Sequence, residues 1–197
     1  MADQNGEKYG FTGLFPIARG KTTELRKYLR SLDDTGAYPG GSPFIHVPII
    51  HMARLFIIDR LAYQGTPAKA DTLQSDYLVF LCDFDGDSVD GLVTALLNGM
   101  PNEAESIWSR CVGFPGIDRH DRFGEYFGRC RITTTLFFVD QPKATVGEIL
   151  KGLMCRRRLG AFIKQVQGGS RDPVALKQGF EDMWRSLQQD RPAPGQL

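Results

Sequence analysis

The chain has 197 residues, of which 42% are hydrophobic, a length and composition typical of one compact domain with a single core. Its 24 Lys and Arg residues nearly balance its 23 Asp and Glu residues, so no overall positive field attracts nucleic acid or an anionic membrane. No apolar run reaches the roughly 20 residues of a membrane-spanning helix, and residues 1–10 lack the apolar region of a signal peptide. We therefore expect a cytoplasmic protein with no membrane span and no nucleic-acid partner.

The four cysteines lie far apart and show none of the Cys and His spacings that build zinc sites. Cys82 lies in the apolar run DYLVFLCDF, and Cys111 lies on an apolar helical stripe. This placement favours buried free thiols, and we expect no disulfide.

The first expected strand covers residues 11–18 and follows a flexible N-terminus of residues 1–10. Thr22 or Thr23 then caps a helix. Its apolar residues recur with helical spacing and define one buried side: Leu25, Tyr28, Leu29 and Leu32.

A second strand is expected at residues 48–59 and a third at residues 77–83. The polar connection between them is too short for a crossover helix, so they should be antiparallel neighbours. The next helix has one apolar stripe and is expected to end at Gly99 with a left-handed cap. The stripe consists of Val89, Leu92, Val93, Leu96 and Leu97.

Asn102 and Glu105 have the spacing of a capping box, which predicts a short helix that contains Trp108 and Cys111. The glycine-rich and charged residues 116–129 predict a loop. The Thr and Phe residues of CRITTTLFFVD, residues 130–140, are typical of a fourth strand.

Thr145 and Glu148 form a second capping-box pattern, which opens a long helix. Asp172 followed by Pro173 starts a final helix, and residues 191–197 form a disordered tail. The resulting fold is α+β: a ferredoxin-like βαββαβ plait over residues 11–166, with a short extra helix before the fourth strand and C-terminal helices. Residues 167–190 form a helical arm.

The second strand is the most informative segment for function, because its apolar sequence FIHVPIIHMARLFIID contains His46, His51 and Arg54. Buried strands seldom contain ionisable side chains unless these are paired or face a cavity. Strand alternation places His51 on the face of Ala53, and Arg54 on the opposite face. His51 could bind a metal or haem, act as a base or donate a core hydrogen bond, and Arg54 could hold an anion or pair with Asp83.

One face of a plait is covered by helices and the other is open. An open apolar face predicts a dimer or a ligand cavity.

The sequence contains no GxSxG, HExxH or GxGxxG motif, so it lacks the usual patterns of hydrolases, zinc proteases and dinucleotide-binding proteins. The acidic run DFDGDSVDG resembles a calcium loop but has Ser88 and Thr94 where such a loop needs glycine and glutamate.

Four segments, IIHMARLFIID, DYLVFLCDFDGD, ESIWSRCVGFPG and TLFFVDQPKATVGEIL, resemble a bacterial family of ferredoxin-like proteins over roughly residues 11–166. His51 and Arg54 match a His and Arg pair of that family. A second matching region consists of Trp108, Cys111, Gly113, Pro115 and Gly116. The resemblance implies an association with oxidative, often haem-dependent, enzymes, and a more distant likeness to dimeric α/β barrels.

Our leading hypothesis is a dimeric plait that binds a small apolar or haem-like ligand and, if it is an enzyme, acts as a peroxidase- or monooxygenase-like oxidoreductase. His51 would be the base or the haem ligand and Arg54 the anion clamp. The ligand would be bound by His46, Phe56, Trp108 and Phe137. The alternative is a non-enzymatic interaction protein that docks through its open sheet face and the C-terminal helix that contains Trp184.

Overall fold

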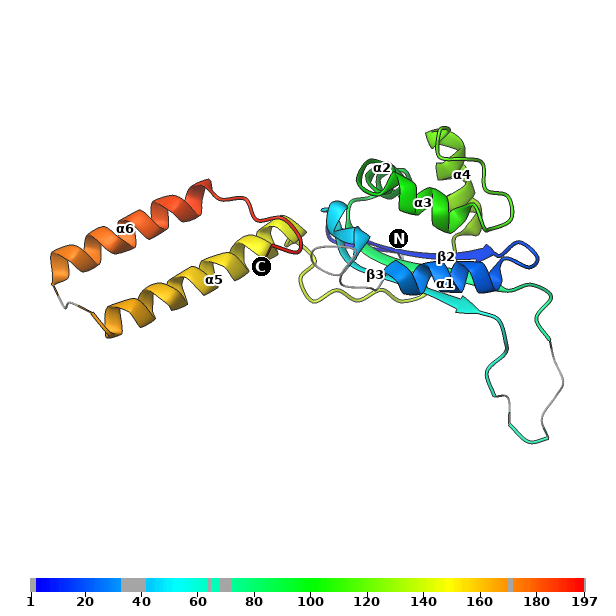
Figure 1. Cartoon of the computed structure of the whole chain (residues 1–197), viewed down its shortest axis with the longest axis horizontal. Helices are drawn as coiled ribbons and strands as arrows, with labels where there is room; N and C mark the ends of the chain where they lie inside the picture. The colour runs from blue at the N-terminus through cyan, green and yellow to red at the C-terminus, as the bar shows by residue number, and fades with distance from the viewer. Residues whose placement is uncertain (1–2, 33–41, 64, 68–71, 170–171, 197) are drawn as a thin grey trace.

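The computed structural model describes residues 3–32, 42–63, 65–67, 72–169 and 172–196. One antiparallel sheet carries helices on one face, and two further helices extend away from it (Figure 1). The elements are β1 (Gln4–Asn5), β2 (Lys8–Pro16), α1 (Thr22–Leu32), the 3-10 turn η1 (Pro43–His46), β3 (Ile50–Ile58), β4 (Tyr77–Asp85), α2 (Val89–Gly99), α3 (Pro101–Trp108), α4 (His120–Cys130), α5 (Val146–Gln167) and α6 (Pro173–Gln189).

The sheet order is β1-β2-β4-β3, so β3 is an edge strand. β2 and β4 pair along their whole length, from Lys8 opposite Asp85 to Pro16 opposite Tyr77. β3 and β4 are antiparallel neighbours, which confirms the prediction from their short connection. β2 begins at Lys8 rather than at the expected residue 11, because a turn at Gly6 (φ 62°) folds β1 back onto it.

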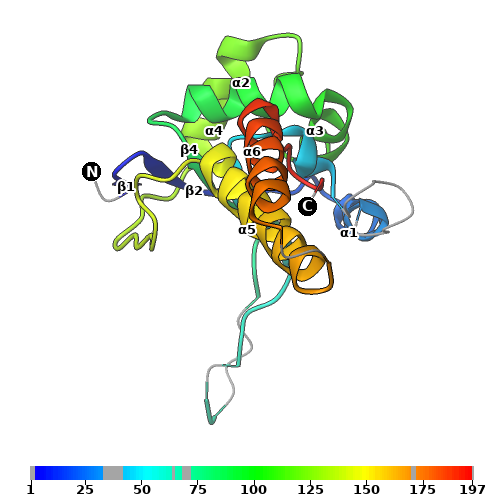
Figure 2. The ribbon, with the colours of Figure 1, turned by 90° about the vertical axis from the view of Figure 1, so that its left-hand side faces the viewer.

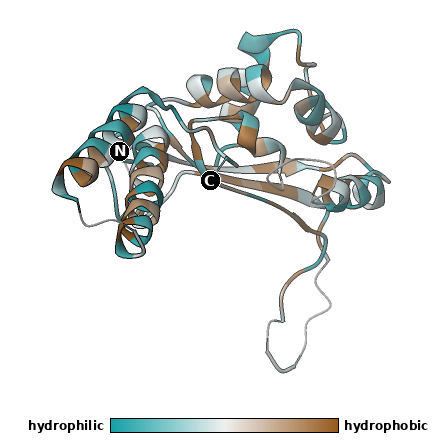
Figure 3. Cartoon of the chain, turned by 60° about the vertical axis from the view of Figure 1, so that its left-hand side comes forward, coloured by the Kyte–Doolittle hydropathy of each residue, from teal (hydrophilic) through white to brown (hydrophobic). Residues whose placement is uncertain are grey.

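An aromatic core fills the space between the sheet and α2, α3 and α4. Trp108 is fully buried there, with its ring centroid 4.9 Å from that of Phe127 and 5.5 Å from that of Phe80. Figure 2 shows the three helices on one side of the sheet, and Figure 3 shows the apolar central strands beneath them. The opposite side of the sheet is open, and we call it the open face.

Several predicted elements are confirmed. α1 buries Leu25 and Leu32, and α2 buries Leu92, Val93, Leu96 and Leu97. Cys82 and Cys111 are buried, as expected. These elements could be predicted because their apolar residues follow the period of a single helix or strand.

The expected fourth strand at residues 130–140 is wrong. α4 continues to Cys130, and beyond it the only sheet pairing within the described residues is an isolated bridge between Arg131 and Gly13. The backbone N–H of Ile132 also donates to the oxygen of Thr12 at 2.8 Å. The four-stranded antiparallel sheet is therefore present, but β1 is its fourth strand, and its order fits a ferredoxin-like plait only loosely.

The N-terminal hairpin explains why this strand does not form. In a plait the last strand would pair with the outer edge of β2, but β1 and Asp3 already occupy that edge from Lys8 to Gly10. Gly10 N–H donates to the oxygen of Asp3 at 2.8 Å, and Glu7 N–H donates to that of Pro142 at 2.9 Å. Residues 131–142 therefore run past the edge of β2 instead of joining the sheet there.

The expected loop at residues 116–129 is also wrong from His120 onward, where α4 forms. Phe123, Tyr126 and Phe127 occupy the i, i+3 and i+4 positions of one buried side, a pattern masked by two glycines and several charges. One glycine, Gly124, packs closely on α2: a Cβ atom there would lie 2.6 Å from a side-chain oxygen of Asp90, which would have to move.

Among the predicted helix caps, two are confirmed and two are wrong. Thr145 and Glu148 form the predicted capping box, and Asp172 caps α6 as predicted. The predicted box at Asn102 and Glu105 is wrong, because α3 begins at Pro101, immediately after α2, and has no side-chain cap. Gly99 is the last residue of α2 and does not have a left-handed backbone.

α5 and α6 form an antiparallel helical hairpin that extends from one end of the sheet, and we call it the arm (Figure 1). The sequence predicted an arm made of the last helix alone. Lys151 of α5 donates to the backbone oxygen of Asp190 at 2.6 Å, and Phe162 packs against Phe180 at 6.1 Å between ring centroids. None of the helices in the described part of the chain is both long and apolar enough to cross a membrane.

Candidate interaction site on the open sheet face

The open face has five rows of residues, each with one residue from β2, β4 and β3. The first row is charged, Arg54 lies in the middle row, and the last two rows are mostly apolar. In order, the rows are Lys8, Asp85 and His51; Gly10, Asp83 and Met52; Thr12, Leu81 and Arg54; Leu14, Val79 and Phe56; and Pro16, Tyr77 and Ile58.

A β-bulge brings His51 to the open face. Ile50 lies opposite Phe84, but Met52 lies opposite Asp83, so His51 is an extra residue in β3. Such a bulge turns two successive side chains to the same side of a strand. The prediction that His51 shares the face of Ala53 is therefore wrong, because Ala53 packs on the core while His51 bonds to a residue of the open face.

Asp85 is the centre of the charged row. Its Oδ1 atom accepts hydrogen bonds from Lys8 and from His51 Nε2, the latter at 2.6 Å. Its Oδ2 atom accepts the backbone N–H of Val146, the first residue of α5, at 2.8 Å. Lys8 is only 2% exposed, so this carboxylate neutralises a buried cation and also connects the sheet to the arm.

The environment of Asp85 stabilises its charged form. Burial alone would raise the pKa of this carboxyl, but the hydrogen bonds from Lys8, His51 and Val146 outweigh burial and lower the pKa below its ordinary value. Asp83, one row away, shows the opposite balance. Burial raises its pKa, and the nearby His51 opposes that shift only in part.

Residues 131–142 cover part of the β2 side of the open face. The ring of Phe137 lies against Gly10, where a Cβ atom would approach it to 3.0 Å. Asp3 holds the start of this segment, because it accepts hydrogen bonds from Arg131 and, at 2.7 Å, from the backbone N–H of Thr134. Leu136 and Phe138, on either side of Phe137, are 86% and 80% exposed.

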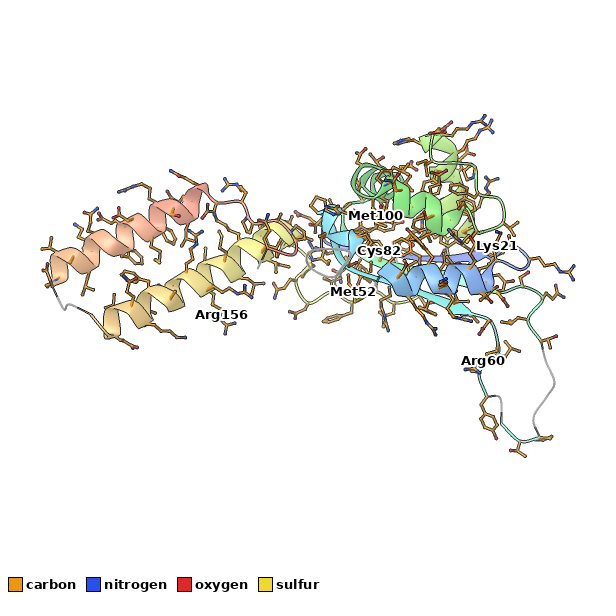
Figure 4. The ribbon with its side chains drawn as sticks, in the orientation of Figure 1. Lys21, Met52, Arg60, Cys82, Met100 and Arg156 are labelled. Atoms are coloured by element: carbon orange, nitrogen blue, oxygen red, sulfur yellow. The ribbon has the colours of Figure 1, made fainter. Side chains whose placement is uncertain are left out.

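The β3 side of the open face is less covered. Met52 is 49% exposed and Phe56 is 44% exposed, and the Arg54 side chain between them is also exposed. Figure 4 shows Met52 on the side of the sheet opposite Met100, which belongs to the core. The open face therefore has a covered half over β2 and an exposed apolar half over β3.

The structure gathers four of the six predicted site residues on this face: His51, Arg54, Phe56 and Phe137. His46 is exposed at the end of η1, before β3 begins. Trp108 lies in the aromatic core on the other side of the sheet. The predicted ligand-binding set is therefore not a single cluster, because Trp108 is separated from His51 by the sheet itself.

Sequence reasoning identifies neither Asp85 as the partner of His51 nor Lys8 as the second donor to Asp85. The sequence predicts a flexible N-terminus around Lys8 and an acidic run around Asp85. Strand alternation contained a signal for Asp85, because it places Asp83 and Asp85 on one face of the third strand. No local pattern could identify Lys8, since its partner lies 77 residues away.

In this arrangement the Nε2 atom of His51 is not free to bind a haem or a metal ion. Nε2 of His51 is already hydrogen-bonded to Asp85, so iron coordination through this atom would require the contact with Asp85 to break. Across the described residues, no group of three or more His, Cys, Asp or Glu side chains could hold a metal ion. The arrangement instead forms a surface with a buried ionic end and an apolar end.

Comparisons with models of known protein families, with curated proteins and with solved structures each found no match. The resemblance of the chain to a ferredoxin-like family stays a prediction.

Proposed function

We propose that this protein is a non-enzymatic accessory protein that acts by docking through its open sheet face and its arm. The observation that carries the proposal is the exposure of large apolar side chains on both surfaces. These are Met52 and Phe56 on β3, and Leu136 and Phe138 on the segment that covers part of β2. Large apolar side chains exposed in this number on one side of a molecule favour a surface that binds another protein.

The arm supports the same proposal. Its two helices pack on each other, yet Trp184 of α6 is 51% exposed and Phe180, stacked on it with ring centroids 6.3 Å apart, is 43% exposed. Ile149, Leu153, Leu159 and Ile163 of α5 are also exposed. A two-helix hairpin with apolar residues on its outer surface is suited to pack against further helices.

We infer that the first partner of the open face is a second copy of this chain. The covered half of the face projects Leu136 and Phe138, whereas the other half exposes Met52 and Phe56. A two-fold axis parallel to the strands would place the covered half of one copy against the exposed half of the other. Such isologous contacts are self-complementary and are the usual basis of homodimers.

The size of the face sets how much the arm must contribute. Three strands of nine residues measure about 30 Å by 14 Å, or roughly 400 Å² in projection. A stable interface buries about 800 Å² of accessible surface per partner. Because residues 131–142 also cover part of this face, the sheet does not supply the required area by itself, and residues 131–142 and the arm would supply the rest.

The experiment measures the molar mass of the full chain by size-exclusion chromatography with light scattering. We expect a dimer for the natural chain and a monomer for the double variant Met52→Asp with Phe56→Asp, because each change buries a charge in an apolar contact. Thr94→Asp is the control, since Thr94 is exposed on α2, on the helix-covered side. A monomeric natural chain, or a double variant that stays dimeric, would contradict the proposal.

The haem-linked oxidative hypothesis stays a prediction with less support from this geometry, because Asp85 already binds the Nε2 atom of His51. Titration with haemin tests it directly. A saturable Soret band that is lost in His51→Ala would support the haem-linked hypothesis.

A cytoplasmic location remains part of our proposal, because all four cysteines are free thiols, as expected in a reducing compartment.

A further inference from the structure

A second site lies at the free edge of β3, where α1 and η1 form a cleft with the strand. The cleft has a volume of about 420 Å³, within the range of about 300–1,000 Å³ that is usual for small-molecule sites. Its walls are mostly apolar and include Leu29 of α1, Phe44 of η1 and Leu55 and Ile57 of β3. The cleft shares Phe56 with the open face, and its other lining residues belong to α1, to η1 with its N-cap Ser42, and to the core-facing positions of β3.

One end of the cleft is cationic. A second hollow of about 580 Å³ shares Arg26, Arg30 and Ile57 with it and adds Asp59 and Arg60. Arg26 is neutralised by Asp59 at 2.6 Å. Arg30 is exposed on α1 and forms no ion pair with another described residue. Figure 4 shows Arg60 where β3 leaves the sheet, so the cationic groups gather at the end of the strand.

We propose that this cleft binds an amphipathic anion, an aliphatic chain that carries a carboxylate or phosphate head. The apolar walls would bury the chain, and Arg30 would bind the head. The guanidinium group suits both heads, because its planar fork donates two parallel hydrogen bonds to carboxylate or phosphate oxygens. Three arginines and one aspartate line this end, so its net positive charge favours an anionic head over a neutral one.

The test uses calorimetric titration of the full chain with dodecanoate and dodecyl phosphate, both below their micellar concentrations. We expect saturable binding of at least one of them, and binding of dodecanol that is at least roughly tenfold weaker. Arg30→Gln should weaken the anion by roughly 10- to 150-fold, the usual effect of losing a hydrogen bond to a charged group. The response to the two heads shows whether a carboxylate or a phosphate is preferred.

Lys27→Gln is the matched control. Lys27 is exposed on the same helix as Arg30 but does not line the cleft. Its replacement by Gln removes the same charge as Arg30→Gln. The affinity of the Lys27→Gln variant for the anion should remain within about twofold of that of the natural chain. Equal loss in both variants, equal binding of dodecanol, or no saturable binding of either anion would overturn the proposal.

Discussion

At the scale of single residues, Asp85 connects three distant parts of the chain. One carboxylate accepts hydrogen bonds from Lys8, from His51 and from the first N–H of α5. Each of these donors would lose its partner if the carboxylate were removed, and a buried unsatisfied donor costs about 1–3 kcal/mol. Asp85 is therefore expected to matter for stability whether or not the protein is an enzyme.

The Asp85→Asn variant should lower the free energy of unfolding by about 1–3 kcal/mol at neutral pH. The lowered pKa of Asp85 gives the sign of the pH dependence. Its charged form stabilises the fold above the ordinary aspartate pKa of about 3.9, and this stability is lost as pH falls through the lower pKa of the folded state. Between about pH 5 and pH 3, the free energy of unfolding measured with urea should therefore fall less steeply in the variant than in the natural chain.

Asp83→Asn is the control for this experiment, because burial raises the pKa of Asp83 in the folded state. The charged form of Asp83 therefore opposes folding at neutral pH, so this variant should be at least as stable as the natural chain there. A steeper acid loss in Asp85→Asn than in the natural chain would contradict the assignment.

Gly99 illustrates a residue required by close approach. A Cβ atom at this position would lie 2.3 Å from the backbone oxygen of His46, which belongs to η1. We expect Gly99→Ala to cost about 1–3 kcal/mol, as measured by urea unfolding, because backbone must move to relieve the contact. Gly128→Ala in α4 is the control. No atom lies within 4 Å of its added Cβ, so it should be neutral or stabilising by up to about 1 kcal/mol.

At the scale of elements, residues 131–142 show how competition for an edge overrides local propensity. The segment has the Thr and Phe composition of a strand, and it would pair with β2 if that edge were free. β1 is present earlier in the chain and closes a tight hairpin onto the same edge. A local hairpin has a smaller loop-closure cost than a strand that returns after more than 100 residues.

The capping box of α5 is the testable local feature of the arm. Thr145 Oγ1 accepts the N–H of Glu148 at 3.2 Å, and Glu148 Oε2 accepts the N–H of Thr145 at 2.8 Å. Thr145→Ala should cost about 0.5–2 kcal/mol. Amide hydrogen exchange should become faster in the first turn of α5. Thr135→Ala changes an exposed threonine of the preceding segment and should leave α5 unchanged; equal exchange in both variants would argue against the box.

At the scale of the whole molecule, the core and the arm contribute separately to stability. The buried core cluster consists of residues from Tyr9 to Phe127, whereas α6 makes its main contacts with α5. A chain that ends after Gln167 should therefore keep the main unfolding transition within about 4 °C, because no residue of that cluster is removed. Calorimetry measures the transition, and hydrogen exchange should be faster in α5, which loses its partner.

A chain that ends after Asp190 keeps α6 and provides the comparison, with α5 protected as in the natural chain. A loss of more than about 10 °C on removal of α6 would show that the arm supports the core, contrary to the packing described above. Light scattering on the chain that ends after Gln167 would also measure how much the arm contributes to the proposed dimer.

The sequence by itself determined the features that depend on neighbours a few residues apart. It located α1, α2 and the capping box of α5, and it showed that β3 and β4 are antiparallel, because helical periods, caps and short connections act locally. Only the tertiary structure decided which segment pairs with the outer edge of β2, that a bulge turns His51 to the open face, and that Lys8 meets Asp85. These outcomes depend on contacts between distant segments that compete for the same edge or charge, and no local pattern records the result of that competition.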